Sequence, residues 1–174
     1  MEKYIIGIIW KSWSWKTTVV NLLNEELSLI RNKNYTTRKE REEEVGKVNN
    51  DYTFIDKEEF INKLENNYFI EYINHWGAFY WIPVPKNSWL LILDPLGSIQ
   101  VEKWCYDNNI IFKSIYLDVD DIIRKERIWL ERYERKEWYF SYFKDKWLFD
   151  YTLSNLTIED NISYIKEIVW KIKE

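Results

Sequence analysis

The stretch Trp10-Lys11-Ser12-Trp13-Ser14-Trp15-Lys16-Thr17-Thr18 decides how this chain folds. It follows an apolar run, Tyr4 to Ile9, that is typical of a buried parallel strand, and it precedes a segment whose apolar residues recur at helical spacing. With glycine in place of each tryptophan it would read Gly-x-x-Gly-x-Gly-Lys-Thr-Thr, which is a phosphate-binding loop. We therefore expect an ATP site here, in which Lys16 reaches the phosphates and Thr17 gives Mg²⁺ a hydroxyl ligand. The candidate nucleotide-binding positions are Trp10, Ser12, Trp13, Ser14, Trp15, Lys16, Thr17 and Thr18.

Tryptophan itself does not suit such a loop, because the backbone there needs positive φ and no bulk. The chain holds 11 Trp and only 4 Gly among 174 residues, whereas average usage predicts roughly 12 Gly. We interpret the loop tryptophans as glycine codons read as tryptophan, through a genetic code in which UGA means glycine. The alternatives are a tryptophan-rich binding surface and a decayed loop, although decay would scatter residue types. Trp104, Trp129 and Trp170 lie in helical segments, where a glycine would cost about 1 kcal/mol, so some tryptophans can be authentic.

Length and composition indicate one soluble domain. A chain of 174 residues buries about 70% of its unfolded surface. The net charge of −4 speaks against a nucleic-acid binder. Cys105 is the only cysteine and His75 the only histidine, so we expect a buried thiol and neither a disulfide within the chain nor a His/Cys metal site. The N-terminal apolar run is too short for a signal or a membrane span, so we expect a cytoplasmic protein without membrane partners, monomeric or dimeric.

Strand-like and helix-like segments alternate, which indicates an α/β fold with a parallel sheet and helices on both faces. Apolar runs and turn signals predict strands at 4–9, 52–55, 69–73, 78–82, 89–94, 110–117 and 151–153. Helical spacing predicts helices at 18–30, 98–108, 119–138 and 158–172. Asp56 and Glu59 form a capping box for a further helix through about Asn66.

Motifs in a fixed order continue from the loop through the first hundred residues. They are Tyr35-Thr36-Thr37-Arg38-x-x-Arg41, Asp51-Tyr52-x-Phe54, Phe69-Ile70-Glu71, Tyr80-Trp81-Ile82-Pro83 and Leu93-Asp94-x-x-Gly97. This order resembles the guanylate kinase family, whose members phosphorylate GMP with ATP. Trp81 stands where the family has the glycine of its Tyr-Gly-Thr/Ser-Pro motif. The resemblance implies a P-loop NTPase-type core, residues 1–33 and 84–174, with a small α+β GMP-binding insertion at about 34–83 and a short lid at about 125–148.

The resemblance also implies how the insertion would bind GMP. Arg38 and Arg41 would fork onto the phosphate, and Tyr52 and Tyr80 would add hydroxyl groups. Glu71 would accept hydrogen bonds from the N1–H and the exocyclic amine of guanine, a pattern that adenine does not offer.

Three departures from the family concern the base. Asn34 stands where a serine usually touches the base, Ile82 replaces the Ser or Thr of the Tyr-Gly-Thr/Ser-Pro motif, and Ile92 stands where a further carboxylate is common. We still expect Asn34 and Ile82 to line the substrate site. We therefore expect narrower discrimination between GMP and its analogues than in a typical member of the family.

The remaining catalytic candidates lie in the core and the lid. Asp94 closes an apolar strand beside the loop and resembles a Walker-B carboxylate that acts on Mg²⁺ together with Thr17. The predicted helix 119–138 carries Arg124, Arg127, Arg132 and Arg135. The resemblance implies lid arginines that neutralise charge on the transferring phosphoryl group, with Arg127 and Arg132 as our candidates.

Each assignment has a simpler alternative. Arg38 and Arg41 can form surface ion pairs with the run Glu42–Glu44, and Glu71 can be an exposed acid at a strand end. The arginines of 119–138 can line a solvated helix face. For the whole chain, the alternatives are a catalytically inactive guanylate-kinase-like interaction module and a related P-loop kinase for another small phosphorylated acceptor.

Overall fold

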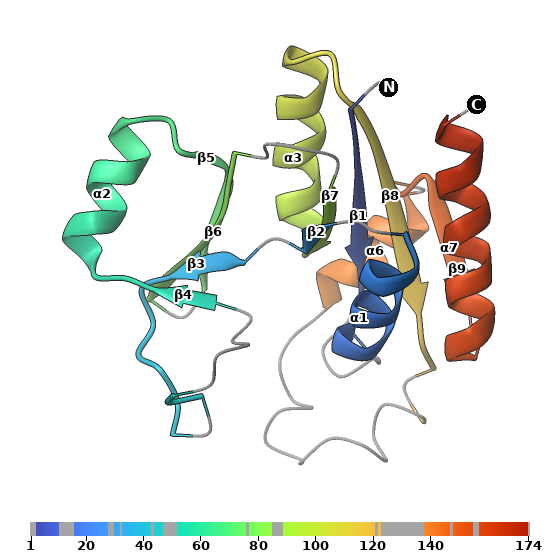
Figure 1. Cartoon of the computed structure of the whole chain (residues 1–174), viewed down its shortest axis with the longest axis horizontal. Helices are drawn as coiled ribbons and strands as arrows, with labels where there is room; N and C mark the ends of the chain where they lie inside the picture. Colours follow the sequence, from blue (N-terminus) through green and yellow to red (C-terminus); the bar gives the residue numbers. More distant parts are fainter. Residues whose placement is uncertain are drawn as a thin grey trace. The chain divides into compact units, whose positions relative to one another are not determined.

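The computed structural model describes most of the chain, in two compact units. The described residues are 3–10, 16–27, 30–31, 33–42, 44–46, 52–75, 77–84, 89–120, 122, 138–146, 148–154 and 157–173. The core unit comprises Met1–Arg31 and Asn87–Glu174, and the small unit comprises Asn32–Lys86. Figure 1 traces the chain through both units.

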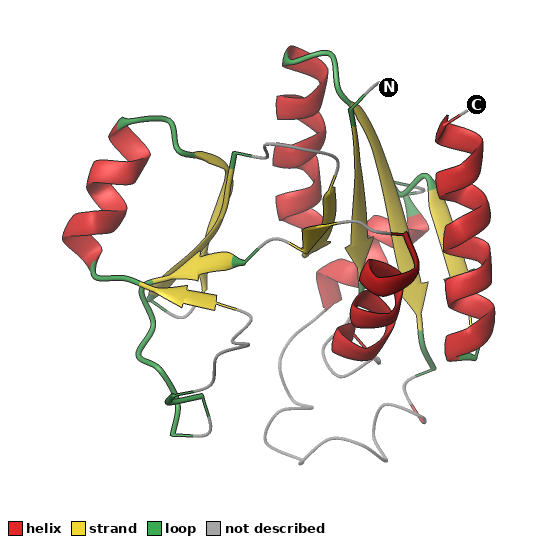
Figure 2. Cartoon of the chain, viewed as in Figure 1, coloured by secondary structure: helices red, strands yellow, loops and turns green. Residues whose placement is uncertain are grey.

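A five-stranded sheet forms the centre of the core unit (Figure 2). Its order is β2 (Ile30–Arg31), β7 (Trp89–Leu93), β1 (Tyr4–Ile9), β8 (Ile111–Asp118) and β9 (Tyr151–Ser154). All of its pairings are parallel. Every residue of β1 is buried, as expected for a central strand that is covered on both faces. The predicted α/β class with a parallel sheet is confirmed.

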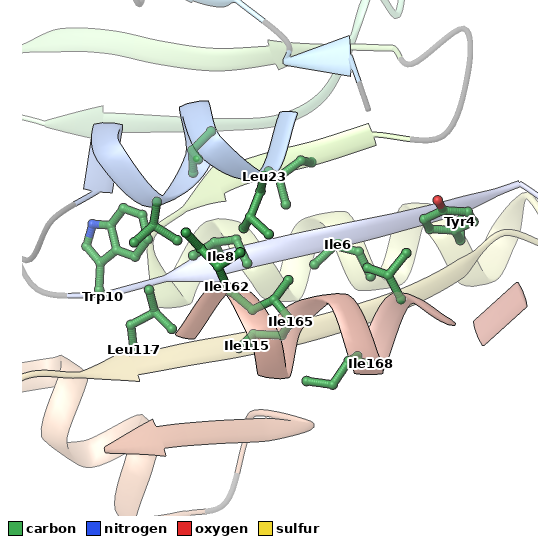
Figure 3. Packing of buried hydrophobic residues seen from close by; sticks show 14 residues of the cluster. Tyr4, Ile6, Ile8, Trp10, Leu23, Ile115, Leu117, Ile162, Ile165 and Ile168 are labelled. Carbon is green, nitrogen blue, oxygen red and sulfur yellow. The ribbon is translucent and has the colours of Figure 1, made fainter. Parts of the chain in front are cut away.

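Helices cover both faces of this sheet. The helices in the described part of the core unit are α1 (Lys16–Leu27), α3 (Pro95–Asp107), α6 (Trp138–Asp145) and α7 (Ile158–Lys173). Figure 3 shows Ile6 and Ile8 of β1 pointing toward Leu23 of α1 and Ile165 of α7, within one buried apolar cluster. The alternate residues of β1 are buried as well, and α3 contacts β1, β7 and β8. Because successive side chains of a strand point to opposite faces, α3 covers the second face.

Several helix boundaries differ from the sequence-based expectation, and α6 lies just beyond the helix predicted at 119–138. Two of the differences have a clear physical reason. The first helix ends at Leu27, and Ile30, which fits the helical spacing, begins β2 beside Trp89. The helix after β7 begins at Pro95 rather than at Ser98, because Asp94 caps it and proline suits the first turn of a helix.

The small unit holds a second sheet of four strands. Its order is β4 (Tyr52–Phe54), β3 (Asn34–Thr36), β6 (Ala78–Pro83) and β5 (Phe69–His75). β3 pairs with β4 in parallel and with β6 in antiparallel orientation, and β5 and β6 form an antiparallel pair. The strands predicted near β4, β5 and β6 are present. The short β3 was not predicted, because its residues lie in a polar stretch without apolar alternation.

Helix α2 (Lys57–Glu65) packs on one face of this sheet through aromatic side chains. Its N-cap is Asp56, whose carboxylate accepts a 2.8 Å hydrogen bond from the N–H of Glu59, as the sequence predicts. Phe60 is the buried residue of the helix, and its ring centroid lies 4.6 Å from that of Phe79 and 4.5 Å from that of Trp81. These ring contacts fix which side of the sheet is covered by α2.

Candidate functional site

Two threonines attach the loop of the predicted phosphate-binding arginines to β6. Thr36 is fully buried, and its hydroxyl donates a 2.9 Å hydrogen bond to the carbonyl of Phe79. Thr37 donates its N–H to the same carbonyl at 3.0 Å and accepts from the N–H of Phe79 at 2.9 Å. The N–H of Arg38 then donates to the Thr36 hydroxyl at 3.2 Å. The loop therefore leaves the sheet at a defined place and direction.

The guanidinium of Arg38 lies over two aromatic rings and pairs with a carboxylate. Its Cζ is 5.0 Å from the ring centroid of Tyr52 and 4.9 Å from that of Phe54, within the range of cation–π attraction. Nη1 and Nη2 each donate a 2.6 Å hydrogen bond to Glu44, and these bonds raise the pKa of Arg38. The rings of Tyr52 and Tyr80 meet edge to face at 5.7 Å. The structure thus brings Arg38, Tyr52 and Tyr80 together.

Arg41 differs from Arg38 because it is exposed and its described contacts are made by its backbone. Its N–H donates to the carboxylate of Glu44 at 3.0 Å, and its carbonyl accepts from the N–H of Glu44 at 2.9 Å. The ion pair that the sequence offered as an alternative is therefore present for Arg38. It is no loose surface pair, since the exposed fractions of the Arg38 and Glu44 side chains are 12% and 18%.

Glu71 lies on the face of the small sheet that α2 does not cover, because a bulge interrupts the alternation of β5. Phe69 faces α2, with its ring 5.9 Å from that of Phe60. The register shifts between Phe69 and Glu71, and Glu71 then pairs with Ile82. Glu71 is only 6% exposed, so the alternative of an exposed acid at a strand end does not hold.

The other expected acceptor residues share this face. Tyr80 and Ile82 are alternate residues of β6, and Ile82 lies opposite Glu71. Asn34 lies on β3, which is next to β6, and it pairs with Tyr52 of β4. Paired residues of neighbouring strands point to the same side. One face of the small sheet therefore carries a buried carboxylate, two phenols and an amide, and the Arg38 guanidinium lies against Tyr52.

Trp81 lies on the opposite face, inside the aromatic cluster beneath α2. It is 1% exposed, and its ring lies 5.9 Å from that of Tyr35 and 5.0 Å from that of Phe69. Within the described part of the chain, its indole N–H is buried without a hydrogen-bond partner. A buried donor without a partner costs about 1–3 kcal/mol. Trp81 therefore fills space in the core of the small unit at the expense of an unsatisfied polar group.

The predicted phosphate loop lies mostly outside the described residues. Its first residue, Trp10, is 4% exposed and belongs to the apolar cluster between the sheet, α1 and α7 (Figure 3). Residues 11–15, and the side chains of the expected ligands Lys16, Thr17 and Thr18, are outside the description. The backbone enters α1 at Lys16, so a strand precedes the loop and a helix follows it, as the motif requires.

Asp94 leaves the sheet at the same edge as this loop. Ile9, at the end of β1, pairs with Leu93, at the end of the parallel neighbour β7. Asp94 also has a structural task that the sequence analysis did not recognise, since its carboxylate accepts a 2.7 Å hydrogen bond from the N–H of Gly97 and caps α3. Carboxylate and hydroxyl oxygens are ligands that Mg²⁺ prefers, so Asp94 and a loop threonine have suitable chemistry for that ion.

The predicted lid lies mostly outside the described residues. Arg124, Arg127, Arg132 and Arg135 lie outside the described residues, and of the proposed lid only 138–146 and residue 148 are described. Cys105 is buried, and burial raises the pKa of its thiol to about 12, as suits a small hydrophobic residue. Across the described ranges, no group of three His, Cys, Asp or Glu is arranged to hold a metal ion, and no helix is long and apolar enough to cross a membrane.

Sequence reasoning missed the role of Glu44. The signal was the spacing Arg38-x-x-Arg41-x-x-Glu44, but three consecutive glutamates at 42–44 do not reveal which of them turns inward. Thr36 and Thr37 were recognised as part of a motif, whereas their anchoring bonds to Phe79 depend on β3, a strand that was not predicted.

Comparison with known proteins finds relatives that share one name. No family model matches the chain. The guanylate kinase of Mycoplasmopsis pulmonis is 28% identical over 98% of this chain and 95% of its own length. The guanylate kinase of Mycoplasmoides gallisepticum is 29% identical over 91% of this chain and 88% of its own length. The guanylate kinase of Blochmanniella floridana is 41% identical over 54% of this chain and 46% of its own length.

A solved structure agrees in fold. The crystal structure of guanylate kinase from Anaplasma phagocytophilum superimposes with a TM-score of 0.75 at 24% identity, covering 98% of this chain and 86% of that one. At this level of identity the match concerns the fold, and the relatives that span the chain supply the link in sequence. The chain is therefore similar in sequence to guanylate kinases over nearly its whole length and similar in fold to a solved guanylate kinase.

Proposed function

We propose that this protein is a guanylate kinase, which transfers the γ-phosphoryl group of ATP to GMP and releases ADP and GDP. Relatives of that name match the chain over nearly its whole length. The observation that carries the proposal is the open face of the small sheet, where Glu71, Tyr80 and Tyr52, each from one of the motifs that resemble the family, lie on one side with Arg38 beside Tyr52.

In the proposed site, the acceptor phosphate binds to Arg38, Arg41, Tyr52 and Tyr80. A guanidinium offers paired N–H donors that match two phosphate oxygens, and a phenol adds a single donor. The contacts of Arg38 with two aromatic rings and with Glu44 support this role, because they hold the cation in one orientation before the ligand arrives.

Glu71 recognises the guanine base in this proposal. A carboxylate accepts from both the N1–H and the exocyclic amine of guanine, and an adenine would leave it without these donors. Burial supports the role, since Glu71 is 6% exposed and a mismatched base costs more where little water can solvate a charged group. Asn34 and Ile82 line the same region, and each has a different side chain from the one that the family motif supplies there.

The core unit binds the donor and the metal. We propose that Lys16 and the backbone of 10–18 hold the ATP phosphates, and that Thr17 and Asp94 hold Mg²⁺, which screens charge on the phosphates when bound. The common edge of β1 and β7 supports this pairing. Residues 1–33 and 84–174 form the catalytic core, about 34–83 the GMP-binding insertion, and about 125–148 the lid, from which Arg127 and Arg132 contact the transferring group. The enzyme works in the cytoplasm on free nucleotides, as a monomer or dimer.

We also propose that Trp10, Trp13, Trp15 and Trp81 are glycines in the native protein, encoded by UGA. Four glycine positions of the family carry one and the same residue here. The buried indole N–H of Trp81, which has no described partner, is a further anomaly that glycine removes. Mass spectrometry of the protein from its source organism tests this directly. Tryptophan in the loop peptide would refute it.

The activity is tested with a protein in which Trp10, Trp13 and Trp15 are changed to glycine. We expect this protein to bind ATP with Mg²⁺ and the unaltered chain to bind it far more weakly, because tryptophan tolerates neither the positive φ nor the close backbone approach that a phosphate-binding loop needs. Steady-state rates with GMP, AMP, CMP and UMP then identify the acceptor. The rate with GMP should be the highest. A higher rate with AMP would overturn the assignment as a guanylate kinase, but the broader assignment as a nucleoside monophosphate kinase would still hold.

A further inference from the structure

One edge of the Arg38 guanidinium is occupied and a second edge is available. Nη1 and Nη2 donate to the two oxygens of Glu44 at 2.6 Å, and Nη1 also donates to the carbonyl of Lys39 at 3.0 Å. These bonds use both hydrogens of Nη1 and one of Nη2. Within the described part of the chain, neither the Nε–H nor the other Nη2 hydrogen makes a hydrogen bond, and in a planar guanidinium these two donors point the same way.

Glu44 is itself fixed by the backbone of the loop. The oxygen that accepts from Nη1 also accepts from the N–H of Arg41 at 3.0 Å, and the N–H of Glu44 returns a 2.9 Å bond to the carbonyl of Arg41. Hydrogen bonding to Arg38 lowers the pKa of Glu44 to about 2, so the carboxylate is charged at neutral pH. Glu44 thus ties the side chain of one phosphate-binding arginine to the main chain of the other.

We propose that Glu44 is a positioning residue of the acceptor site, which holds Arg38 by its Nη1–Nη2 edge so that the Nε–Nη2 edge stays presented to the phosphate of GMP. The inference rests on the proposed function, in which Arg38 binds that phosphate. The rings of Tyr52 and Phe54 support the plane of the guanidinium, and Glu44 fixes its rotation within that plane.

This arrangement favours ligand binding because the side chain of Arg38 is already ordered before the ligand arrives. A free arginine side chain loses considerable rotamer entropy when it binds a ligand, whereas Arg38 has lost it already on folding. In the opposite case, the carboxylate competes with the phosphate for the same cation. The two effects predict opposite changes in GMP affinity when the charge of Glu44 is removed.

The test is the affinity of the full chain for GMP and for guanosine in the absence of ATP, measured by titration calorimetry. Glu44→Gln removes the charge and changes little in size. Glu42→Gln is the matched control, since Glu42 is an exposed acid of the same loop. Arg38→Ala and the double variant Arg38→Ala with Glu44→Gln complete a thermodynamic cycle.

We expect Glu44→Gln to weaken GMP binding roughly tenfold, as for the loss of one charge-assisted hydrogen bond, and to leave guanosine binding unchanged. Glu42→Gln should change neither, and the double variant should bind GMP like Arg38→Ala. Tighter GMP binding in Glu44→Gln, equal losses for GMP and guanosine, or a further loss in the double variant would overturn the inference. If Arg38→Ala itself leaves GMP affinity unchanged, the proposed phosphate site is wrong, which is a separate outcome.

Discussion

The carboxylate of Asp94 accepts a 2.7 Å hydrogen bond from the backbone N–H of Gly97 and thereby caps helix α3. Asp94 directly follows β7, whose neighbour β1 leads into the predicted phosphate loop. The same side chain is therefore placed to begin a helix and, in the proposed enzyme, to bind Mg²⁺. The two tasks make different demands, because a cap needs an acceptor oxygen and a metal ligand of this type needs the negative charge.

Substitution of Asp94 separates these tasks. Asn is as good an N-cap as Asp, so Asp94→Asn should leave the free energy of unfolding nearly unchanged, whereas Asp94→Ala should lower it by about 1 kcal/mol. Both variants should lose most of the kinase activity of the glycine-restored protein, because both remove the charge. Urea unfolding and steady-state rates at several Mg²⁺ concentrations measure the two effects. Full activity in Asp94→Asn would confine Asp94 to the structural task.

A second prediction concerns the base. In the glycine-restored protein, Glu71→Gln should place an amide donor against a donor of guanine, at a cost of about 1–3 kcal/mol in kcat/KM for GMP. The same substitution should lower kcat/KM for AMP much less. Arg38→Ala should instead slow every monophosphate alike, because a phosphate contact carries no information about the base. Equal losses for GMP and AMP in Glu71→Gln would remove Glu71 from base recognition.

Much of the fold could be predicted from the sequence, because the strands of the core unit are continuous apolar runs and their helices have clear apolar spacing. The strands β1, β7 and β8 and the helix α7 lie within a few residues of their predicted positions. What failed were features that depend on tertiary pairing. Ile30 fits the stripe of α1 but pairs with Trp89 in β2, and β3 exists because β4 and β6 flank it on both sides.

The candidate site was predictable in its residue types and less so in its contacts. The motif order led to Arg38, Tyr52, Glu71 and Tyr80, which the structure places on or against one face of the small sheet. The bulge that turns Glu71 to that face has no sequence signal, because Phe69 and Glu71 would share a face in a regular strand. The choice of Glu44 among three adjacent glutamates depends likewise on the turn that begins at Arg41.

The thiol of Cys105 should be unreactive in the folded protein. Burial raises its pKa to about 12, so almost no thiolate is present at neutral pH, and the thiolate is the reactive form. Iodoacetamide at pH 8 should leave Cys105 unmodified in native buffer and alkylate it fully in urea, as read by intact mass. Alkylation at equal rates in both conditions would contradict the buried position.

Asp150 should contribute more to stability than an ordinary surface acid. Its carboxylate accepts from the N–H and the hydroxyl of Ser114 at 2.8 and 2.9 Å and from Lys113 at 2.7 Å, which joins β8 to the start of β9. Asp150→Ala leaves the N–H of the buried Ser114 without its acceptor and should lower the free energy of unfolding by about 1–3 kcal/mol.

The control for Asp150 is Asp107→Ala. Asp107 pairs with Lys103 on the surface of α3, where the two side chains are 52% and 75% exposed, so its loss should change stability by less than about 1 kcal/mol. Chemical denaturation of both variants gives the comparison. Equal effects of the two substitutions would mean that the contacts of Asp150 add nothing beyond those of an exposed pair.

The pH dependence of the arginine loop follows from the ion pair of Arg38 and Glu44. Hydrogen bonding to Arg38 lowers the pKa of Glu44 from 4.5 to about 2, so the folded protein favours the ionised carboxylate. The resulting stabilisation of the folded chain is complete above pH 4.5 and is lost as the pH falls toward 2. At that low pH the Glu44 carboxyl group is protonated in both the folded and the unfolded chain, so the ion pair no longer favours folding. Carbon-detected NMR of the glutamate carboxyl groups should show that the pKa of Glu44 lies well below 4.5, and Arg38→Ala should return it toward 4.5. Glu44→Gln should correspondingly reduce the loss of folding stability between pH 4.5 and pH 2. A pKa of Glu44 that does not respond to Arg38→Ala would contradict the hydrogen-bonded pair on which the positioning role depends.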